Sequence, residues 1–416
     1  MAIKLGKRKQ IKGVDDQAYL TLKEERAISK MNMKVMKEFE RKKRRENVDP
    51  SEYLTTMRDP DNVVEFDNLH TFFFTDVGTT RAVNGVSFDV PTGKTIGIVG
   101  ESGCGKSVTS LSLMQLVQAP QGQIVEGSIR YKASDGKVYD IPKVPMSEML
   151  HIRGKEIAMI FQEPMTSLNP VFRIGRQLDE VVLLHVPDST PASAKQRSIE
   201  MLKTVGIADG DRVYNSYPHE LSGGMRQRVM IAMALICDPR LIIADEPTTA
   251  LDVTIQAQIL ELLRSIKDRI NGSIMLITHD LGVIAEMADH VVVMYAGRII
   301  EEGTVREIFH SPKHPYTVGL MKSKPRVDQD VKRLYSIPGQ VPNPINMPDY
   351  CYFYNRCPRA MDVCLGPYPA QIPFSPTHRA ACLLYDEAAL ARQAEMDNAA
   401  GEPGPARAEQ DGEEQA

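Results

Sequence analysis

Long apolar runs are absent from the sequence, since none approaches the roughly 18 residues that a membrane-spanning helix needs. The first residues are basic and polar, without the apolar stretch and cleavage site of a secretory signal. These two absences argue against an integral membrane protein and a secreted one. We therefore expect a cytoplasmic protein, whose role at any membrane must come through a partner or a surface contact.

Internal repeats are also absent. The 416 residues include 42% apolar and 25% charged residues, which are the proportions of an ordinary globular protein. This length exceeds the usual size of one domain. We expect one large domain with appendages, or two domains, and enough residues for a sizeable core.

The two ends of the chain carry opposite charges. Residues 4–47 contain 15 Lys and Arg against 7 Asp and Glu, whereas the residues from Asp386 onward contain 2 against 9. We expect residues 1–60 to be a basic extension with a helix in residues 17–45. This extension is either solvated or attracted to anionic lipid headgroups. Residues 386–416 are expected to form an acidic disordered tail.

Short apolar segments rich in β-branched residues recur along the middle of the chain. They lie at residues 95–99, 241–244, 274–277 and 291–294, and helical stretches separate them. This alternation predicts an α/β fold with a largely parallel sheet covered by helices, in a domain of residues 61–310. A Pro- and Cys-rich segment at residues 311–385 breaks the alternation and predicts a separate small module.

The sequence GESGCGKS at residues 100–107 predicts a phosphate-binding loop, or P-loop. It matches G-x-x-x-x-G-K-S, follows the apolar strand TIGIV and opens a helix. Glycines let backbone N–H groups approach the phosphates, Lys106 reaches the β- and γ-phosphates, and Ser107 can bind Mg²⁺. The residues predicted to contact nucleotide here are Gly100, Ser102, Gly103, Cys104, Gly105, Lys106, Ser107 and Val108.

Two acidic residues end the apolar segment LIIADE. A carboxylate at the end of a core strand beside a P-loop suits a Mg²⁺ contact, which assigns Asp245 to the metal. Glu246 is then placed to polarise the attacking water as a general base. Taken alone, such a pair is also compatible with a strand that ends at solvent or a helix cap.

The order of the remaining motifs carries a resemblance to a known family. LSGGMRQR at residues 221–228 lies between the two phosphate-site motifs, and TTALD at 248–252 and ITHD at 277–280 follow them. This series resembles the ATP-binding cassette (ABC) ATPases over residues 63–309. The resemblance implies a head-to-tail dimer, in which Ser222, Gly223 and Gly224 of one subunit cover the ATP bound to the other. A Ser hydroxyl and N–H groups at a helix start form an anion site.

The resemblance assigns further positions. Gln162 in IFQEP matches the glutamine that contacts Mg²⁺ or the water and adjoins the membrane subunits. His279 matches the histidine that contacts the γ-phosphate, and Asp252 matches the aspartate of the loop that crosses the dimer interface. The aromatic residue that stacks on adenine is expected to be Phe73, with its neighbours at 72 and 74 as alternatives.

One position departs from the commonest pattern of the family. Met225 stands where the signature usually has Gln, so a polar contact to the partner's nucleotide is lost. Subunits of peptide importers resemble this sequence in having Met there. Because Glu246 and His279 are both present, we expect ATP hydrolysis rather than a site that only holds nucleotide.

The segment after the ATPase domain narrows the resemblance. HSPKHPYTVGL at residues 310–320 and RCPRAMDVC at 356–364 resemble the corresponding region of dipeptide and oligopeptide importers. The resemblance implies a D-type ATPase subunit that energises peptide import, peripheral at the cytoplasmic face of the inner membrane. Its implied partners are two transmembrane permease subunits, an external substrate-binding protein, and a paralogous ATPase subunit or a second copy. No nucleic acid partner is expected.

Four cysteines lie in the same segment, at Cys351, Cys357, Cys364 and Cys382. Disulfides do not suit a cytosolic ATPase, and the spacing lacks the short C-x-x-C pairs that structural zinc sites prefer. Iron–sulfur proteins use wider spacings and Cys-Pro steps. The resemblance to importer subunits that carry a [4Fe–4S] cluster favours this cofactor over Zn²⁺, and free buried cysteines are the remaining alternative.

Other function classes would leave different marks on the sequence. ABC ATPases of translation carry two motif sets in one chain, and only one set is present here. DNA-repair ATPases of this type insert a long coiled coil between P-loop and signature. Residues 107–221 lack heptads and have about the size of a compact helical subdomain, which we expect here. Importers of nickel, glutathione or other small solutes share the architecture and are the nearest alternative.

Overall fold

The larger of two sheets carries the buried apolar segments of the sequence. The computed structural model describes residues 21–43, 45, 48–162, 167–248, 253–323 and 335–400. Within these residues, the larger sheet has the strand order β11-β12-β10-β9-β3-β8-β7-β6. Its strands are β3 (Thr95–Val99), β6 (Ile157–Ile160), β7 (Leu241–Asp245), β8 (Ser273–Ile277), β9 (His290–Tyr295), β10 (Arg298–Thr304), β11 (Ile372–Pro373) and β12 (Arg379–Ala380).

The first five of these strands in chain order run parallel, and the last three are antiparallel to their neighbours. Every residue of β3, β6, β7 and β8 is buried, which explains their nearly continuous apolar sequences. The four apolar segments expected to be strands coincide with β3, β7, β8 and β9. The prediction of an α/β fold with a largely parallel sheet is therefore confirmed.

The smaller sheet is antiparallel and has the order β2-β1-β4-β5. Its strands are β1 (Asn62–Thr75), β2 (Gly78–Pro91), β4 (Gly122–Lys132) and β5 (Val138–Asp140). Phe66 and Phe88 stack on each other across β1 and β2 with ring centroids 4.4 Å apart. They share one core cluster with Ile98 of β3 and Leu113, so this sheet packs against the larger one.

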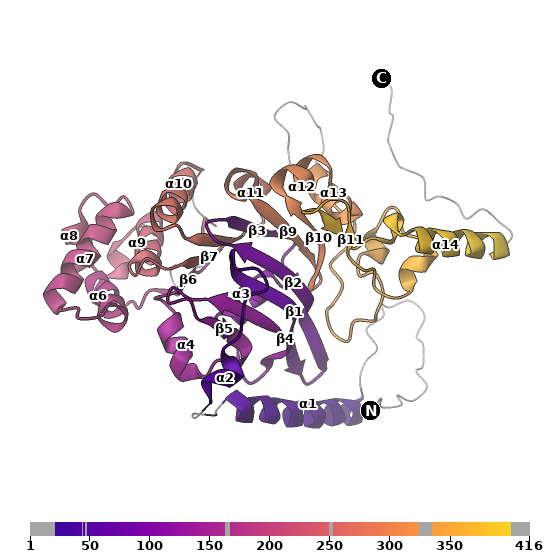
Figure 1. The fold of residues 1–416 in the computed structure, drawn as a ribbon, viewed down its shortest axis with the longest axis horizontal. Coiled ribbons are helices and arrows are strands. Elements are labelled where there is room, and N and C mark those ends of the chain that lie inside the picture. Colours follow the sequence, from indigo (N-terminus) through magenta and orange to yellow (C-terminus); the bar gives the residue numbers. More distant parts are fainter. Residues whose placement is uncertain are drawn as a thin grey trace, which may run out of the picture.

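Four helices gather on the side of the larger sheet where β6 and β7 lie (Figure 1). They are α6 (Ile174–His185), α7 (Pro191–Thr204), α8 (Gly210–Asn215) and α9 (Gly223–Leu235). Pro191 follows the N-cap Thr190 of α7, and Ser222 caps α9, so the sequence itself defines both helix starts. These helices form a compact helical subdomain, in which α6, α7 and α8 lie between P-loop and signature and α9 begins within the signature.

The remaining helices flank both sheets or follow the last parallel strand. The longer ones are α1 (Leu22–Lys43), α3 (Lys106–Leu113), α10 (Val253–Ile270), α13 (Pro315–Lys322) and α14 (Glu387–Ala400). The shorter ones are α2 (Pro50–Tyr53), α4 (Met146–Ile152), α11 (Leu281–Met287) and α12 (Val305–His310), with 3₁₀ turns η1 (Ile141–Lys143), η2 (Pro218–Glu220), η3 (Tyr354–Arg356), η4 (Asp362–Leu365) and η5 (Leu383–Tyr385). None of the described helices combines the length and apolarity required to cross a bilayer.

The basic N-terminal segment forms α1, which lies along the smaller sheet (Figure 1). Asn32 is buried there, and its Nδ2 donates hydrogen bonds to the carbonyl oxygens of Thr75 (2.7 Å) and Gly78 (3.4 Å). Gln123 of β4 also donates a hydrogen bond to Glu40 (2.9 Å). The helix is thus attached to the smaller sheet by polar contacts, while its Lys and Arg residues are exposed.

The acidic end of the chain differs from the disordered tail that its composition predicts. Residues 387–400 form α14, and residues 401–416 lie outside the described part. Ala389 is fully buried, its N–H bonds to the Asp386 carboxylate (3.1 Å), and Gln393 accepts a hydrogen bond from the N–H of Val363 (3.1 Å). Tertiary contacts and Ala-rich helix propensity together outweigh the polar composition.

The Pro- and Cys-rich segment packs directly onto the larger sheet. Its strand β12 pairs with β10, and Met347, Tyr352 and Phe353 belong to the same core cluster as β8 and α9. The packing of this segment is therefore continuous with that of the ATPase sheet.

Candidate functional site

The candidate site lies at one edge of the larger sheet. Strands β6, β7, β8 and β3 are parallel neighbours, so their carboxyl ends meet at the same edge, where α/β folds bind ligands. The P-loop follows β3, Asp245 and Glu246 end β7, His279 follows β8, and Gln162 follows β6. Four predicted motifs that are far apart in sequence are thereby brought together.

The three glycines of the P-loop share an unusual backbone conformation but differ in the space around them. Gly100, Gly103 and Gly105 all have positive φ angles, which residues with a Cβ rarely adopt. A Cβ at Gly100 would clash with the carbonyl oxygen of Met294, and one at Gly105 with that of Ala82. A Cβ at Gly103 would meet nothing within 4 Å. Gly103 therefore leaves open space above the loop, where backbone N–H groups can approach a phosphate.

The two polar side chains that follow the glycines begin α3. Lys106 is buried, and its Nζ donates hydrogen bonds to the carbonyl oxygens of Gly100 (2.7 Å) and Glu101 (3.0 Å). The hydroxyl of Ser107 donates to Oδ1 of Asp245 at 3.1 Å. The structure therefore places two of the three residues assigned to Mg²⁺, Ser107 and Asp245, side by side. Cys104, fully buried below the loop, is a packing residue whose pKa is raised by burial.

Burial is the main cause of a raised pKa at Asp245, and the neighbouring charge of Glu246 acts in the same direction. The hydrogen bond from Ser107 and the charge of Lys106 lower this pKa and partly oppose the shift. A partly desolvated carboxylate beside a hydroxyl is a ligand set that Mg²⁺ prefers, since both donors are oxygen atoms. The residues therefore fit the metal to which the sequence assigns them.

Both carboxylate oxygens of Glu246 are held by predicted site residues. Gln162 donates from Nε2 to Oε2 at 2.8 Å, and His279 donates from Nδ1 to Oε1 at 3.2 Å. Glu246 has a φ of 48°, and its own N–H bonds to the carbonyl oxygen of Ile277 on β8 (2.8 Å). The His279 side chain is 66% exposed, whereas that of Glu246 is 16% exposed. The sequence placed all three residues in the site but did not predict these contacts.

The signature residues lie on α9, in the helical subdomain rather than at the P-loop edge (Figure 1). Ser222 caps the helix, with its hydroxyl accepting a hydrogen bond from the N–H of Met225 (3.4 Å). A Cβ at Gly223 would meet nothing within 4 Å, and the nearest atom to one at Gly224 is 3.7 Å away. This helix start is open to a ligand brought by another molecule. Asp252 lies outside the described residues.

The three phenylalanines at the end of β1 differ in exposure. Phe74 is buried, while Phe72 and Phe73 are half-buried. The ring of Phe72 contacts His70 edge-on (5.8 Å between centroids) and the guanidinium of Arg81 (5.8 Å). The ring of Phe73 lies beside Gly122, near the segment that follows α3. The stacking of Phe73 on adenine stays a prediction.

Three residues of the P-loop environment escaped the sequence analysis. Glu101, the second residue of the P-loop, receives hydrogen bonds from Arg356 of η3 at 2.6 and 2.9 Å. The N–H of Glu101 donates to the hydroxyl of Tyr316 on α13 (2.8 Å). Glu101 occupies a variable position of the motif, and no local pattern links it to residues more than 200 positions away.

The four cysteines lie in one region, but their side chains do not form a metal site. Burial raises the pKa of Cys351 and Cys382 to about 12 and that of Cys357 to about 11, and nearby cysteines contribute to the shifts of Cys351 and Cys382. The pKa of Cys364 is also raised by burial. Among the described residues, no group of three or more His, Cys, Asp or Glu side chains is arranged to hold a metal ion. This geometry does not support the predicted iron–sulfur cluster or zinc site.

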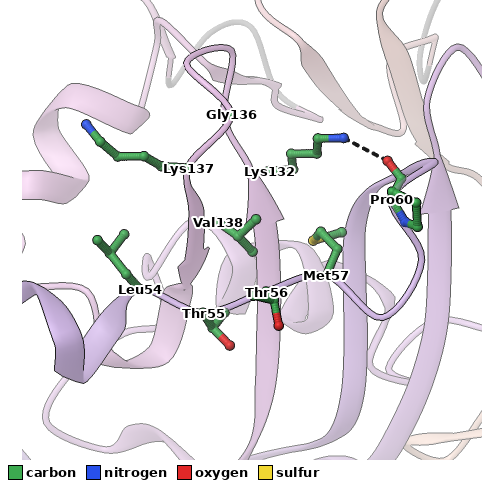
Figure 2. Close-up of a pocket in the computed structure, with 9 residues that line it drawn as sticks. All are labelled: Leu54, Thr55, Thr56, Met57, Pro60, Lys132, Gly136, Lys137 and Val138. Atoms are coloured by element: carbon green, nitrogen blue, oxygen red, sulfur yellow. Dashed lines mark hydrogen bonds between the residues drawn. The ribbon is translucent and has the colours of Figure 1, made fainter.

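A surface hollow of about 380 Å³ lies apart from the nucleotide site (Figure 2). It is bounded by residues 54–60 and by the β4–β5 hairpin, and Lys132 closes one side by donating to the carbonyl oxygen of Pro60 (2.7 Å). Its lining includes no residue of the four converging motifs. The hollow therefore has no part in the chemistry described above.

Comparisons with known proteins agree with this geometry. Residues 83–249 match the ABC transporter family, and residues 300–364 match the oligopeptide/dipeptide transporter C-terminal region. The chain is 49% identical to the oligopeptide transport ATP-binding protein AppD of Bacillus subtilis over 325 residues, which cover 78% of this chain and 97% of the relative. It is 50% identical to the dipeptide transport ATP-binding protein DppD of the same organism over 329 residues, which cover 79% and 96%.

A solved structure extends the likeness to the fold. The dimeric ATP-binding cassette MJ0796, in a post-hydrolysis state bound to ADP and Pi, superposes with a TM-score of 0.52 and 25% sequence identity. The match covers 58% of this chain and 99% of the cassette. The chain belongs to the ABC transporter family, among the ATP-binding proteins of oligopeptide and dipeptide transporters.

Proposed function

We propose that this chain binds and hydrolyses ATP to energise the import of dipeptides or oligopeptides through membrane permease partners. The observation that carries the proposal is the convergence of the P-loop, Asp245, Glu246, Gln162 and His279 at one edge of a parallel sheet. The relatives reported above are named for oligopeptide and dipeptide transport, which favours peptides over nickel or glutathione.

The P-loop holds the phosphates of ATP. The space above Gly103 admits them, and Lys106 turns from the loop carbonyls towards the β- and γ-phosphates. Ser102, Cys104 and Val108 complete the loop and the first turn of α3, and Phe73 stacks on adenine. Ser107, Asp245 and Gln162 would hold Mg²⁺, which neutralises charge on the phosphates.

Glu246 acts as the general base towards water. Its two oxygens are oriented by Gln162 and His279, so the carboxylate is held in place before the water is polarised. His279 is exposed and can turn towards the γ-phosphate when nucleotide is bound. The strained backbone of Glu246 is compatible with a functional constraint at this residue.

The second half of each nucleotide site comes from a partner subunit. Ser222, Gly223 and Gly224 form a helix start with open space for a ligand, since Ser222 and Gly223 are exposed and a Cβ at Gly223 would meet nothing within 4 Å. We expect this surface and Asp252 to face ATP held by a paralogous ATPase subunit or a second copy. Two permease subunits, contacted near Gln162, and an external binding protein complete an importer in which this chain is peripheral on the cytoplasmic face.

The cysteine region supports a narrower proposal. We propose that Cys351, Cys357, Cys364 and Cys382 hold an iron–sulfur cluster, with zinc as the alternative, because the four thiols share one small region and influence each other electrostatically. Holding a cluster would require these side chains to move from the positions described above, which do not form a metal site. About four irons per chain in anaerobically purified protein would support a cluster. Absence of iron, sulfide and zinc would leave free buried cysteines.

The function is tested by Mg²⁺-dependent ATP turnover of the purified chain, wild type beside Glu246→Gln. A positioned general base contributes about 10²–10⁴-fold, so turnover should fall at least a hundredfold while nucleotide binding persists. Unchanged turnover would overturn the role of Glu246. Uptake of a labelled dipeptide by vesicles that contain the whole importer then tests the substrate, with nickel and glutathione as competing substrates.

The partner is tested separately by purification through a tagged permease subunit. Recovery of this chain with a second, related ATPase and two permeases would support the heterodimer. Recovery of this chain alone with both permeases would show that two copies form the motor.

A further inference from the structure

Three groups of Glu101, its N–H, its carbonyl and its carboxylate, are each held by a different residue of the chain. Its N–H donates to the hydroxyl of Tyr316 (2.8 Å), and its carbonyl oxygen accepts a hydrogen bond from Lys106 (3.0 Å). Its carboxylate accepts two hydrogen bonds from Arg356, at 2.6 and 2.9 Å. Such a bidentate, charge-assisted pair is both strong and directional. The conformation of the P-loop at its second residue is thus fixed from the C-terminal region.

Arg356 is itself oriented by its surroundings. Its side chain is only 5% exposed, its Nε donates to the carbonyl oxygen of Pro338 (2.8 Å), and its Nη1 donates to the hydroxyl of Tyr295 (3.3 Å). The guanidinium also lies 5.7 Å from the ring centre of Tyr295 and 5.9 Å from that of Phe353. The guanidinium is therefore fixed in direction by groups other than Glu101.

An aromatic cluster joins these groups to the P-loop side of the sheet. Tyr295 of β9 contacts Tyr316 (4.8 Å between ring centroids) and Phe353 (5.3 Å), and Tyr316 contacts Phe353 (5.5 Å). All three side chains are buried. Since packed aromatic side chains have little freedom, a displacement of Arg356 cannot be absorbed without moving the groups that fix Glu101.

The contact between Arg356 and Glu101 also balances the negative charge of Glu101. Its carboxylate lies in the loop that receives the polyanionic nucleotide, where an uncompensated negative charge would repel the phosphates. Arg356 supplies the compensating positive charge through its two hydrogen bonds. Removing Arg356 alone would leave a half-buried carboxylate in the P-loop without its cation.

We propose that Arg356 is a positioning residue for ATP binding, which acts through Glu101 to fix the P-loop and to cancel its acidic charge. The inference rests on the proposed function, since it requires the loop to bind ATP. It gives the C-terminal region a direct effect on the nucleotide site. Arg356 immediately precedes Cys357, so the cysteine-bearing segment itself supplies this contact.

The test compares the variants Arg356→Met, Arg356→Lys, Glu101→Gln and the double variant Arg356→Met/Glu101→Gln in the full chain. Steady-state MgATP turnover and the affinity for a fluorescent ATP analogue are measured for each. Arg356→Met should raise the KM for ATP about tenfold with a smaller change in kcat, as expected for lost loop positioning. The KM of Arg356→Lys should lie between those of wild type and Arg356→Met, because Lys keeps the positive charge but cannot donate the bidentate pair of hydrogen bonds.

The double variant distinguishes charge compensation from packing. If Arg356 acts through Glu101, removing both charges should give a KM below that of Arg356→Met alone. Arg379→Met is the matched control, because Arg379 pairs with Glu302 on the same side of the sheet and away from the P-loop. Its KM should stay within about twofold of wild type, because β9 separates the strands of this pair, β10 and β12, from β3 and the P-loop.

Three outcomes would overturn the inference: equal KM values for Arg356→Met and Arg379→Met, a double variant as impaired as the product of its single variants, or a wild-type KM in Glu101→Gln. The last measurement decides the matter even if Arg356→Met fails to fold, because Glu101→Gln keeps the size of the side chain and is expected to raise KM two- to threefold. Failure of wild-type protein to bind the ATP analogue would instead refute the proposed function.

Discussion

The nucleotide site and the cysteine segment of this chain are built in different ways. Four motifs of the nucleotide site lie at the ends of buried parallel strands, and the parallel pairing of β6, β7, β8 and β3 brings these strand ends together. Residues 335–400 instead contain two short antiparallel strands, 3₁₀ turns and a terminal helix, placed by contacts with distant residues. A site at the ends of parallel strands can be predicted from local sequence motifs. The contacts of a segment that is held by distant residues cannot be predicted in this way.

The metal-holding part of the nucleotide site should show the largest effect. Asp245→Asn removes the charge that pairs with Ser107 at the end of β7, and MgATP turnover should fall about a hundredfold or more. The control is Glu286→Gln on α11, in a surface ion pair with Arg264 of α10, which should change turnover less than twofold. A wild-type rate in Asp245→Asn would remove Asp245 from the site.

The cysteine segment should affect stability if it shares the core of the ATPase domain. Phe353→Ala deletes a buried ring that contacts Tyr295 and Tyr316, and should lower the free energy of unfolding by about 3–5 kcal/mol. Phe374→Ala, in the same segment but 36% exposed, should cost clearly less. Urea unfolding followed by circular dichroism measures both. Equal small costs would mean that the segment packs as an independent unit.

Loss of one hydrogen bond to Glu246 should have a smaller effect, which falls on kcat rather than on ATP affinity. His279→Ala removes one of the two hydrogen bonds that orient the carboxylate, so kcat should fall about ten- to a hundredfold while ATP affinity changes little. His310→Ala, an exposed histidine at the end of α12, serves as the control. A large loss of affinity with unchanged kcat would show that His279 binds nucleotide rather than supporting Glu246.

Acid sensitivity should be the mildest effect, and it originates in the C-terminal half. Burial lowers the pKa of His314 to about 3 and that of His290 to about 4, below the ordinary value of about 6.5. The unfolded chain therefore binds more protons between these values, so stability should decline as pH falls from about 6.5. His314→Asn keeps an acceptor for the N–H of Tyr316 and should flatten this decline in urea midpoints. If the urea midpoints of His314→Asn fall with pH as they do in wild type, His314 is not a source of the acid sensitivity.

The sequence predicts the strand-end residues of the nucleotide site, but it does not predict contacts between side chains that are far apart in the chain. LIIADE and ITHD each join a buried strand to polar residues, and both strands and their end residues are where the sequence predicted them. The hydrogen bonds from Gln162 and His279 to Glu246 could not be predicted, because they depend on side-chain directions across three strands. The prediction of a disordered acidic tail was wrong for residues 387–400, which form a helix. Contacts of Ala389 and Gln393 favour this helix over the disorder that the composition suggests.

The sequence by itself determined the P-loop, the acidic pair, the signature and the α/β alternation, because each depends on neighbouring residues and on the period of local structure. Only the tertiary structure decided that Glu101 meets Arg356 and Tyr316, and that the cysteine segment extends the ATPase sheet through β12. These contacts join residues more than 75 positions apart. Their formation depends on how packed elements share one core, which no local pattern encodes.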